Sequence, residues 1–292
     1  MTAPKKYLMK ITFNQKSLDL SSPKIMGILN LTPNSFSDGG DYYDPAMALD
    51  RAYEMIEQGA DILDIGAEST NPKAMPITSI EETARLLPVI KVLRAKLDIP
   101  LSIDTFRAET MKVMLSEGVD IINDVTALSD EGSLEAVTNS KAAIVLMHML
   151  GNHEKMHFTG DYAKEGGIAK AVEKKLLEKA KACINAGIHP SRIILDPGFG
   201  FDKAPNDQLS LLKELGNITT QSPYPYLVGV SRKRFIGAVT KVENAKERMA
   251  GSLAVALWSI EHGAKILRVH DVKETKEAFL MWEAMQNAKL SS

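Results

Sequence analysis

Short apolar runs alternate with longer amphipathic stretches along most of the chain. The runs are four to six residues long and rich in Ile, Val and Leu, which is typical of strands buried on both faces of a parallel sheet. They recur about every 34 residues, the size of one strand–helix unit. The eight runs lie at 25–30, 62–66, 101–104, 120–123, 143–148, 192–196, 226–231 and 265–270.

Helical patterns fill the gaps between these runs. In 45–59 the apolar residues follow a 3.6-residue spacing. Thr78, followed three residues later by Glu81, has the pattern of a capping box and predicts that a helix over 78–96 begins there. Further helices are expected near 106–117, 133–140, 163–186, 206–215, 244–262 and 273–288.

Eight strand–helix repeats predict an α/β fold, a (β/α)₈ TIM barrel. Residues 7–20 indicate a short β-hairpin that turns at Asn14 and Gln15 and closes the bottom of the barrel. A doubly wound sheet is the alternative, but no Gly-x-Gly-x-x-Gly pattern follows any run. We expect one domain over 1–292, with the hairpin and extension in 1–24 and the barrel in 25–288.

Composition narrows the class of protein. Apolar content of 45%, charged content of 25% and a net charge of −2 are ordinary for a globular protein and give no basic surface for nucleic acid. Cys183 is the single cysteine, which excludes an intrachain disulfide; its helical surroundings predict a small buried hydrophobe. The N-terminus lacks the apolar core of a signal peptide, and no run is long enough to span a membrane. We expect a cytoplasmic protein with neither nucleic acid nor membrane as a partner.

The predicted strands end in polar residues, and in a TIM barrel the carboxyl ends of the strands form the active site. Amide and carboxylate side chains suit a heterocycle with ring N–H donors, whereas cationic side chains suit phosphate oxygens. The pattern therefore predicts a ligand that combines a fused heterocycle with phosphate. The first group comprises Asp104, Asn123 and Asp196, and the second Lys233, Arg268 and His270, while Asn30 ends the first strand. Ser69, Asp124 and Asp271 are expected to serve structure instead.

Three loops contain the glycines and prolines of mobile or tightly turned segments: 31–44, 67–77 and 196–201. Phe36, Phe199 and Phe201 lie in them and invite stacking on an aromatic substrate. For Phe199, packing beneath its loop is an equal alternative. Loops that close over a site suit a reaction whose electrophile must be kept from water.

The motifs in these loops and strand ends resemble those of the dihydropteroate synthase family, in the family's order from Lys24 to about Phe279. They are IMGILNLTPNSFSDGG, DILDIGAESTNP, LSIDTFRAE, IINDV, VLMHMLG, IILDPGFGF, LVGVSRKRFIG and ILRVHDV. The resemblance implies a transferase of folate biosynthesis. Such an enzyme condenses 6-hydroxymethyl-7,8-dihydropterin pyrophosphate with p-aminobenzoate to give 7,8-dihydropteroate and pyrophosphate.

The resemblance also implies roles for individual residues. Pterin contacts are expected from Asp104, Asn123, Asp196 and Lys233. Arg268 and His270 would hold the pyrophosphate, and Asn30 would bind Mg²⁺, the expected cofactor, and phosphate. The p-aminobenzoate pocket would comprise Phe36, Thr70, Pro72, Phe201 and Lys233. The residues expected to act in catalysis are Asn30, Lys233, Arg268 and His270.

The resemblance further implies sulfonamides as inhibitors and a homodimer. Apolar faces near the C-terminus, with Leu253, Leu257, Phe279 and Trp282, are candidates for the dimer contact, and packing on the barrel is the alternative. The chain departs from the family pattern at Asn71, where arginine is usual, at Ala67, where glycine is usual, and at Arg234, where many members have serine. Arg234 would help bind the substrate carboxylate or be solvated at a helix start.

Two other functions remain open on the sequence. A pterin-binding barrel can instead move a methyl group from methyltetrahydrofolate to a corrinoid protein, but the segment 34–40 and the Ser-Arg-Lys strand end argue against this. A paralogue that binds pterin without catalysis has Asn71 as its support. Because Asn30, Arg268 and His270 are present, the active synthase is favoured.

Overall fold

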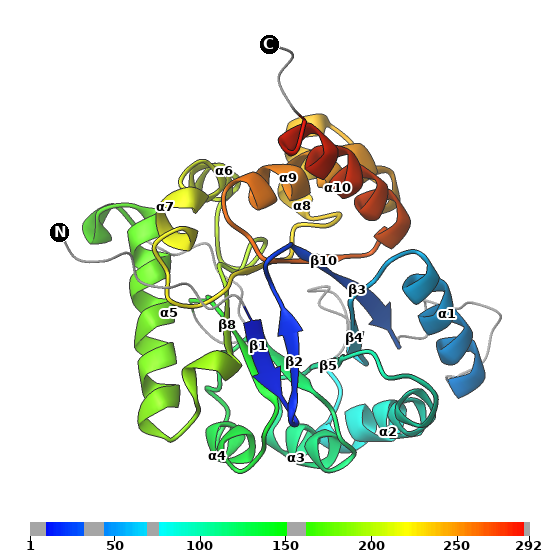
Figure 1. Cartoon of the computed structure of the whole chain (residues 1–292). Helices are drawn as coiled ribbons and strands as arrows, with labels where there is room; N and C mark the ends of the chain where they lie inside the picture. The colour runs from blue at the N-terminus through cyan, green and yellow to red at the C-terminus, as the bar shows by residue number, and fades with distance from the viewer. Residues whose placement is uncertain (1–9, 32–43, 69–75, 151–161, 289–292) are drawn as a thin grey trace.

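Eight parallel strands form a barrel surrounded by helices (Figure 1), in a computed structural model that describes residues 10–31, 44–68, 76–150 and 162–288. The hydrogen-bonded order is β8-β7-β6-β5-β4-β3-β10-β9, so each strand lies beside its neighbour in the chain and β10 returns to β3. The barrel strands are β3 (Lys24–Asn30), β4 (Ile62–Gly66), β5 (Leu101–Asp104), β6 (Ile121–Asp124), β7 (Ala143–Met147), β8 (Ile193–Asp196), β9 (Leu227–Val228) and β10 (Ile266–Val269). The predicted fold class is confirmed.

The barrel closes between β8 and β9, where the two strands pair over very few residues. Leu195 and Tyr226 form an isolated parallel bridge, and the Leu195 amide donates to the Pro225 carbonyl at 3.0 Å. β9 itself has two residues, although the sequence pattern predicts a strand over 226–231. The difference arises because the chain turns sharply at Ser231 and Arg232. Arg232 takes a left-handed φ of 60°, and the Lys233 amide donates back to the Val230 carbonyl at 3.2 Å.

An N-terminal hairpin lies across one end of the barrel (Figure 1). It comprises β1 (Lys10–Phe13) and β2 (Lys16–Asp19), and its turn residues Asn14 and Gln15 have φ of 42° and 66°. Positive φ at both central residues is the geometry of a two-residue hairpin turn. Buried residues of the hairpin pack on inward-facing residues of the strands, so the barrel is closed at its amino end, as predicted. These residues are Ile11, Phe13 and Leu20 from the hairpin segment, with Met26, Ile62, Ile121, Ala143, Val145, Ile194, Leu227 and Ile266 from the barrel.

The helices pack on the outside of the barrel (Figure 1). The α-helices are α1 (Pro45–Glu57), α2 (Ser79–Lys96), α3 (Ala108–Ser116), α4 (Ser133–Thr138), α5 (Ile168–Asn185), α6 (Pro205–Lys213), α7 (Leu215–Thr219), α8 (Arg234–Thr240), α9 (Met249–Glu261) and α10 (Val272–Gln286). Short 3₁₀ turns lie at Tyr162–Glu165, Pro190–Arg192 and Ala245–Glu247. The α8 helix begins at Arg234, where a helix start was expected, and the expected helix over 244–262 is a 3₁₀ turn followed by α9.

Two local predictions hold at the level of side chains. Thr78 and Glu81 form the capping box of α2: the Glu81 amide donates to Thr78 Oγ1 at 3.2 Å, and the Thr78 amide donates to Glu81 Oε2 at 2.7 Å. Cys183 is a buried free thiol on α5, and burial raises its pKa to about 11. Among the described residues, no helix is both long and apolar enough to cross a membrane.

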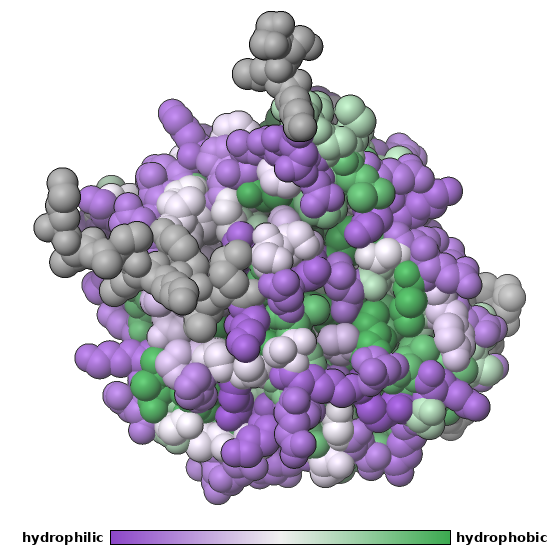
Figure 2. Space-filling view, viewed as in Figure 1, coloured by the Kyte–Doolittle hydropathy of each residue, from purple (hydrophilic) through white to green (hydrophobic). Residues whose placement is uncertain are grey.

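The C-terminal helices α9 and α10 expose apolar side chains, and Figure 2 shows apolar surface around them. The exposed residues are Met249, Trp258, Leu280, Met281 and Met285. Phe279, expected among the candidates for a dimer surface, is only 5% exposed because its ring packs into the core. Leu257 and Trp282 also pack against that core.

Candidate active site at the carboxyl ends of the strands

Strand register brings three of the predicted polar residues, Asn30, Asp104 and Asn123, to one level at the barrel mouth. Asn30 is paired with Gly66, Gly66 with Asp104, and Asp104 with Asn123, across four consecutive strands. Asp196, the last residue of β8, is paired with Met147 on the neighbouring strand. Because these strands are parallel, their carboxyl ends and the polar side chains on them share one rim.

Arg268 on β10 joins two carboxylates at this level. Its Nε atom donates to Asp64 Oδ2 and its Nη2 atom to Asp104 Oδ2, both at 2.6 Å. Asp64 Oδ2 also accepts the Asn123 amide at 3.1 Å. These charge-assisted contacts fix the plane of the guanidinium group.

Burial raises the pKa of two carboxyl groups at the barrel mouth. Desolvation, with repulsion from Asp64, raises the pKa of Asp104 to about 7 against the opposing effect of Arg268. Desolvation also raises the pKa of Asp196 to about 6, while the Gly198 amide, which donates to Asp196 Oδ1 at 2.7 Å, favours its ionised form. The pKa of each group will therefore change when a ligand enters the barrel mouth, because the ligand alters its solvation and its neighbouring charges.

Lys233 lies over the glycine-rich segment that follows β8. Its ammonium is 4.3 Å from the centre of the Phe201 ring, a cation–π contact. A Cβ atom on Gly200 would come within 2.8 Å of Lys233 Cδ, so glycine permits the close approach. Burial lowers the pKa of Lys233 to about 8, and Arg268 adds to that effect. A buried cation of this kind is suited to an anionic or electron-rich ligand.

Lys203 holds the same glycine-rich segment, residues 196–201, in place through hydrogen bonds. The side chain is fully buried, and its ammonium donates to the carbonyls of Gly198 at 2.8 Å, Phe201 at 3.1 Å and His148 at 3.2 Å. Gly198 has a φ of 71°, and a Cβ atom there would lie 2.0 Å from the His148 carbonyl oxygen. The backbone of this segment is therefore restricted to one conformation, and that conformation sets the position of Phe201.

His270, after β10, is a buried neutral imidazole. Desolvation, together with the nearby charges of Arg232 and Arg268, lowers its pKa to about 3. Ser231 Oγ accepts the His270 backbone amide at 3.2 Å and lies 3.0 Å from Nδ1. Ser231 Oγ can donate its hydroxyl hydrogen to Nδ1, and in that tautomer the ring proton lies on Nε2. In this tautomer the neutral His270 ring offers Nε2–H as a hydrogen-bond donor.

A small apolar cluster, separate from the main core, lies next to these polar groups. It comprises Val125, Met147 and Phe201, with Phe106 and Met149 packed against it. Phe201 belongs both to this cluster and to the contact with Lys233. Phe199 is 1% exposed and packs near Phe235, so the packing alternative is correct for that residue.

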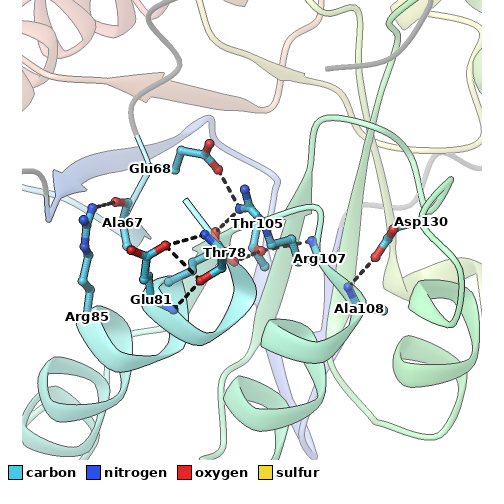
Figure 3. Close-up of polar contacts among 10 residues, drawn as sticks. Ala67, Glu68, Thr78, Glu81, Arg85, Thr105, Arg107, Ala108 and Asp130 are labelled. Atoms are coloured by element: carbon cyan, nitrogen blue, oxygen red, sulfur yellow. Dashed lines mark hydrogen bonds and ion pairs between the residues drawn. The ribbon is translucent and has the colours of Figure 1, made fainter. Parts of the chain in front are cut away.

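A second polar network holds the two ends of the segment between β4 and α2 (Figure 3). Arg107 Nη1 contacts Glu68 Oε2 at 2.6 Å and Glu82 Oε1 at 3.2 Å. The Thr105 hydroxyl donates to Glu82 Oε2 at 2.8 Å, and Arg85 donates to the Ala67 carbonyl at 3.1 Å. Ala67 and Glu68, just before 69–75, are therefore fixed to α2 and to the start of α3.

Several predicted residues lie outside the described part of the chain: Phe36, Ser69, Thr70, Asn71 and Pro72. Asp124 is structural, as expected, since it accepts the Thr126 and Leu128 amides at 2.7 Å each. Asp271 pairs with Arg232 instead of capping α10. Arg234 is exposed at the first turn of α8, which agrees with the solvated alternative.

Sequence reasoning missed two buried charges that organise the mouth, Asp64 and Lys203. A carboxylate inside the apolar run Ile-Leu-Asp-Ile-Gly was a usable signal, because an unpaired charge there would be very costly. Lys203 gave a weaker one, since lysine near a loop is ordinarily solvated.

Comparison with known proteins places these features in a family. The pterin-binding enzyme family matches residues 26–270. Dihydropteroate synthase of Neisseria meningitidis serogroup B is 46% identical over 92% of this chain and 94% of the relative. The enzyme of Escherichia coli K12 is 41% identical over 96% of this chain and 98% of its own length.

Solved structures of dihydropteroate synthases superimpose on nearly the whole of this chain. Xanthomonas albilineans dihydropteroate synthase in complex with 7,8-dihydropteroate superimposes with a TM-score of 0.85 at 38% identity, covering 96% of this chain and all of that one. A Yersinia pestis dihydropteroate synthase with a sulfonamide drug gives a TM-score of 0.88, also at 38% identity, over 96% and 100% of the two chains. The barrel, its mouth and these relatives together show that the chain belongs to the dihydropteroate synthase family.

Proposed function

We propose that this chain condenses 6-hydroxymethyl-7,8-dihydropterin pyrophosphate with p-aminobenzoate, giving 7,8-dihydropteroate and pyrophosphate. The observation that carries the proposal is the barrel mouth, where the Asp104, Asn123 and Asp196 strand ends share one rim with Arg268 and Lys233. Its acceptors match the N–H groups of a pterin, and its cations match a pyrophosphate.

The ring would be recognised by the carboxylates and the amide. Asp104 and Asp196 accept hydrogen bonds from ring N–H and amino groups when ionised, whereas Asn123 can both donate and accept. The cluster of Val125, Met147 and Phe201 offers apolar contact to the ring faces. Lys233 contacts the ring from the Phe201 side.

The reaction breaks the C–O bond between the pterin methylene and the pyrophosphate, which leaves with the electron pair. Arg268 and neutral His270, as donors, stabilise the negative charge that develops on the leaving oxygen, the main catalytic effect expected at such a site. The amine of p-aminobenzoate then forms the C–N bond with its lone pair and releases a proton to solvent. An aniline nitrogen is neutral at pH 7, so no general base is assigned.

The site fits a Mg²⁺ ion held mainly by substrate. Asn30 at the end of β3 offers an amide oxygen close to the level of Asp104, and Mg²⁺ commonly takes one or two protein oxygens together with phosphates and water. When bound, the ion would neutralise charge on the pyrophosphate.

The p-aminobenzoate pocket is proposed to lie beside Phe201 and Lys233, completed by Phe36, Thr70 and Pro72 from the segments outside the described residues. Sulfonamides, which imitate p-aminobenzoate, would compete there. This proposal is supported by the sulfonamide complex of the Yersinia pestis relative.

We further propose that the chain acts as one barrel domain in the cytoplasm and as a homodimer. The single reduced and buried cysteine suits a reducing compartment. The exposed apolar side chains of α9 and α10 support pairing of two copies through these helices.

The test is an assay of the purified protein with dihydropterin pyrophosphate, p-aminobenzoate and Mg²⁺, measuring dihydropteroate and pyrophosphate. Formation of both in equal amounts is expected. Pterin binding without either product would instead identify an inactive paralogue, and pyrophosphate alone would identify a hydrolase. In the same assay Asn71→Arg should keep or raise activity, because it restores the usual family residue.

A further inference from the structure

Asp64 is a fully buried carboxylate in the middle of β4, between the buried apolar residues Leu63 and Ile65. A charge at such a position is tolerated only when it is paired and hydrogen-bonded. Its Oδ2 atom accepts from Arg268 Nε at 2.6 Å and from Asn123 Nδ2 at 3.1 Å. Its Oδ1 atom is buried and has no hydrogen-bond partner among the described residues.

The partners of Asp64 distinguish it from a carboxylate that only holds the barrel together. Asp120, just before β6, is the matched case at the opposite end: it pairs with Arg94 at 2.9 Å. Asp120 also accepts the Leu101 amide at 3.0 Å and Asn14 Nδ2 at 3.2 Å, so it binds backbone and hairpin. The hydrogen bonds of Asp64, in contrast, go to two side chains of the mouth.

Loss of the Asp64 charge would change what Arg268 does. The guanidinium is shared between Asp64, through Nε, and Asp104, through Nη2. Without Asp64 it can turn its full fork toward Asp104, since paired donors favour one carboxylate. Arg268 would then leave the position it holds for an anion, and the acceptor atoms of Asp104 would be occupied.

We propose that Asp64 is a positioning residue of the reaction. Without touching substrate, its carboxylate sets the plane of Arg268 and the rotamer of Asn123 so that one can meet the pyrophosphate and the other the pterin edge. The inference rests on the proposed function, because it uses the roles assigned there to Arg268 and Asn123. It adds a residue from the barrel interior to those at the rim.

The experiment compares Asp64→Asn with Asp120→Asn, two near-isosteric changes of buried, arginine-paired carboxylates. Binding of 6-hydroxymethyl-7,8-dihydropterin pyrophosphate without p-aminobenzoate is measured by calorimetry, and thermal unfolding is followed in parallel. Asp64→Asn should weaken binding by about 10- to 100-fold, by analogy with residues that orient metal ligands through hydrogen bonds. Asp120→Asn should lower the unfolding temperature and leave this affinity unchanged.

A second readout does not depend on activity. In a ¹⁵N-labelled protein the Arg268 Nε–H signal, assigned by its loss in Arg268→Lys, should move in Asp64→Asn and stay in Asp120→Asn. The proposal is overturned if Asp64→Asn binds the pterin pyrophosphate like the unchanged protein. It is also overturned if the Arg268 signal does not move. Tight binding by the unchanged protein without formation of dihydropteroate would refute the proposed function alone.

Discussion

Asp104 is the residue whose charge state most directly controls the mouth. Groups from four directions face its carboxyl: Arg268 from β10, Asp64 from β4, Glu82 from α2, and Lys233 before α8. Desolvation exceeds the pull of the cations, and its pKa is about 7. Near neutral pH, Asp104 is therefore divided between an acceptor and a neutral acid that has lost part of its accepting capacity.

Pterin affinity should accordingly fall as pH is lowered through 7. The ionised carboxylate accepts hydrogen bonds from the ring N–H groups. Protonation below its pKa of about 7 removes this binding-competent form, so the affinity falls by up to about tenfold per pH unit. The measurement is calorimetry with 6-hydroxymethyl-7,8-dihydropterin, which lacks the pyrophosphate and its own titration. Asp104→Asn should remove the step near 7 and keep only that of Asp196 near 6. A step that persists near 7 would contradict the assignment.

Asp104→Ala addresses the same residue without changing pH. It removes the acceptor and releases the Arg268 Nη2 atom from its 2.6 Å contact. Pterin affinity should drop by at least about tenfold, since a buried charged hydrogen bond is lost. Unchanged affinity in the same calorimetric titration would exclude Asp104 from the pterin pocket.

At the scale of elements, the segment after β8 depends on one ammonium group. Lys203 donates to three carbonyls that would otherwise be buried without partners. Lys203→Met, which keeps the length and removes the donor, should lower the free energy of unfolding by about 3 kcal/mol. Urea unfolding checks this, with Lys213→Met on the exposed end of α6 as the control, expected to change stability little. Equal stability of the two variants would mean that the segment holds its shape without Lys203.

The elements also show what sequence patterns can predict. Seven of the eight barrel strands and the α2 capping box follow from local signals, an apolar run or a Thr–Glu spacing, within a residue of the observed bounds. β9 was predicted too long because Gly229, Val230 and Ser231 continue its apolar pattern, while the positive φ of Arg232 is fixed by tertiary contacts such as its amide to Ser252 at 2.9 Å. Asp64 was missed because its partners are 59 and 204 residues away in the sequence.

At the scale of the whole molecule, the exposed apolar side chains gather on the C-terminal helices (Figure 2). Leu280 on α10 is 50% exposed and Ile80 on α2 is 79% exposed, so the two provide a matched pair. Leu280→Glu should convert the proposed dimer to monomer, because a charge buried in an interface without a partner is costly. Light scattering after gel filtration measures the mass. Ile80→Glu should leave the dimer intact, and a monomeric unchanged protein would refute the proposed assembly.

The bridge between Leu195 and Tyr226 gives the barrel a seam. Elsewhere each strand pairs with its neighbours over at least two registered residues, whereas β8 and β9 meet through one isolated bridge. Native-state opening should begin where the fewest backbone bonds must break. The seam is flanked by the strand that ends in Asp196 and by the turn that leads to Lys233. Local opening of the barrel at this seam would therefore move both of these pocket residues together.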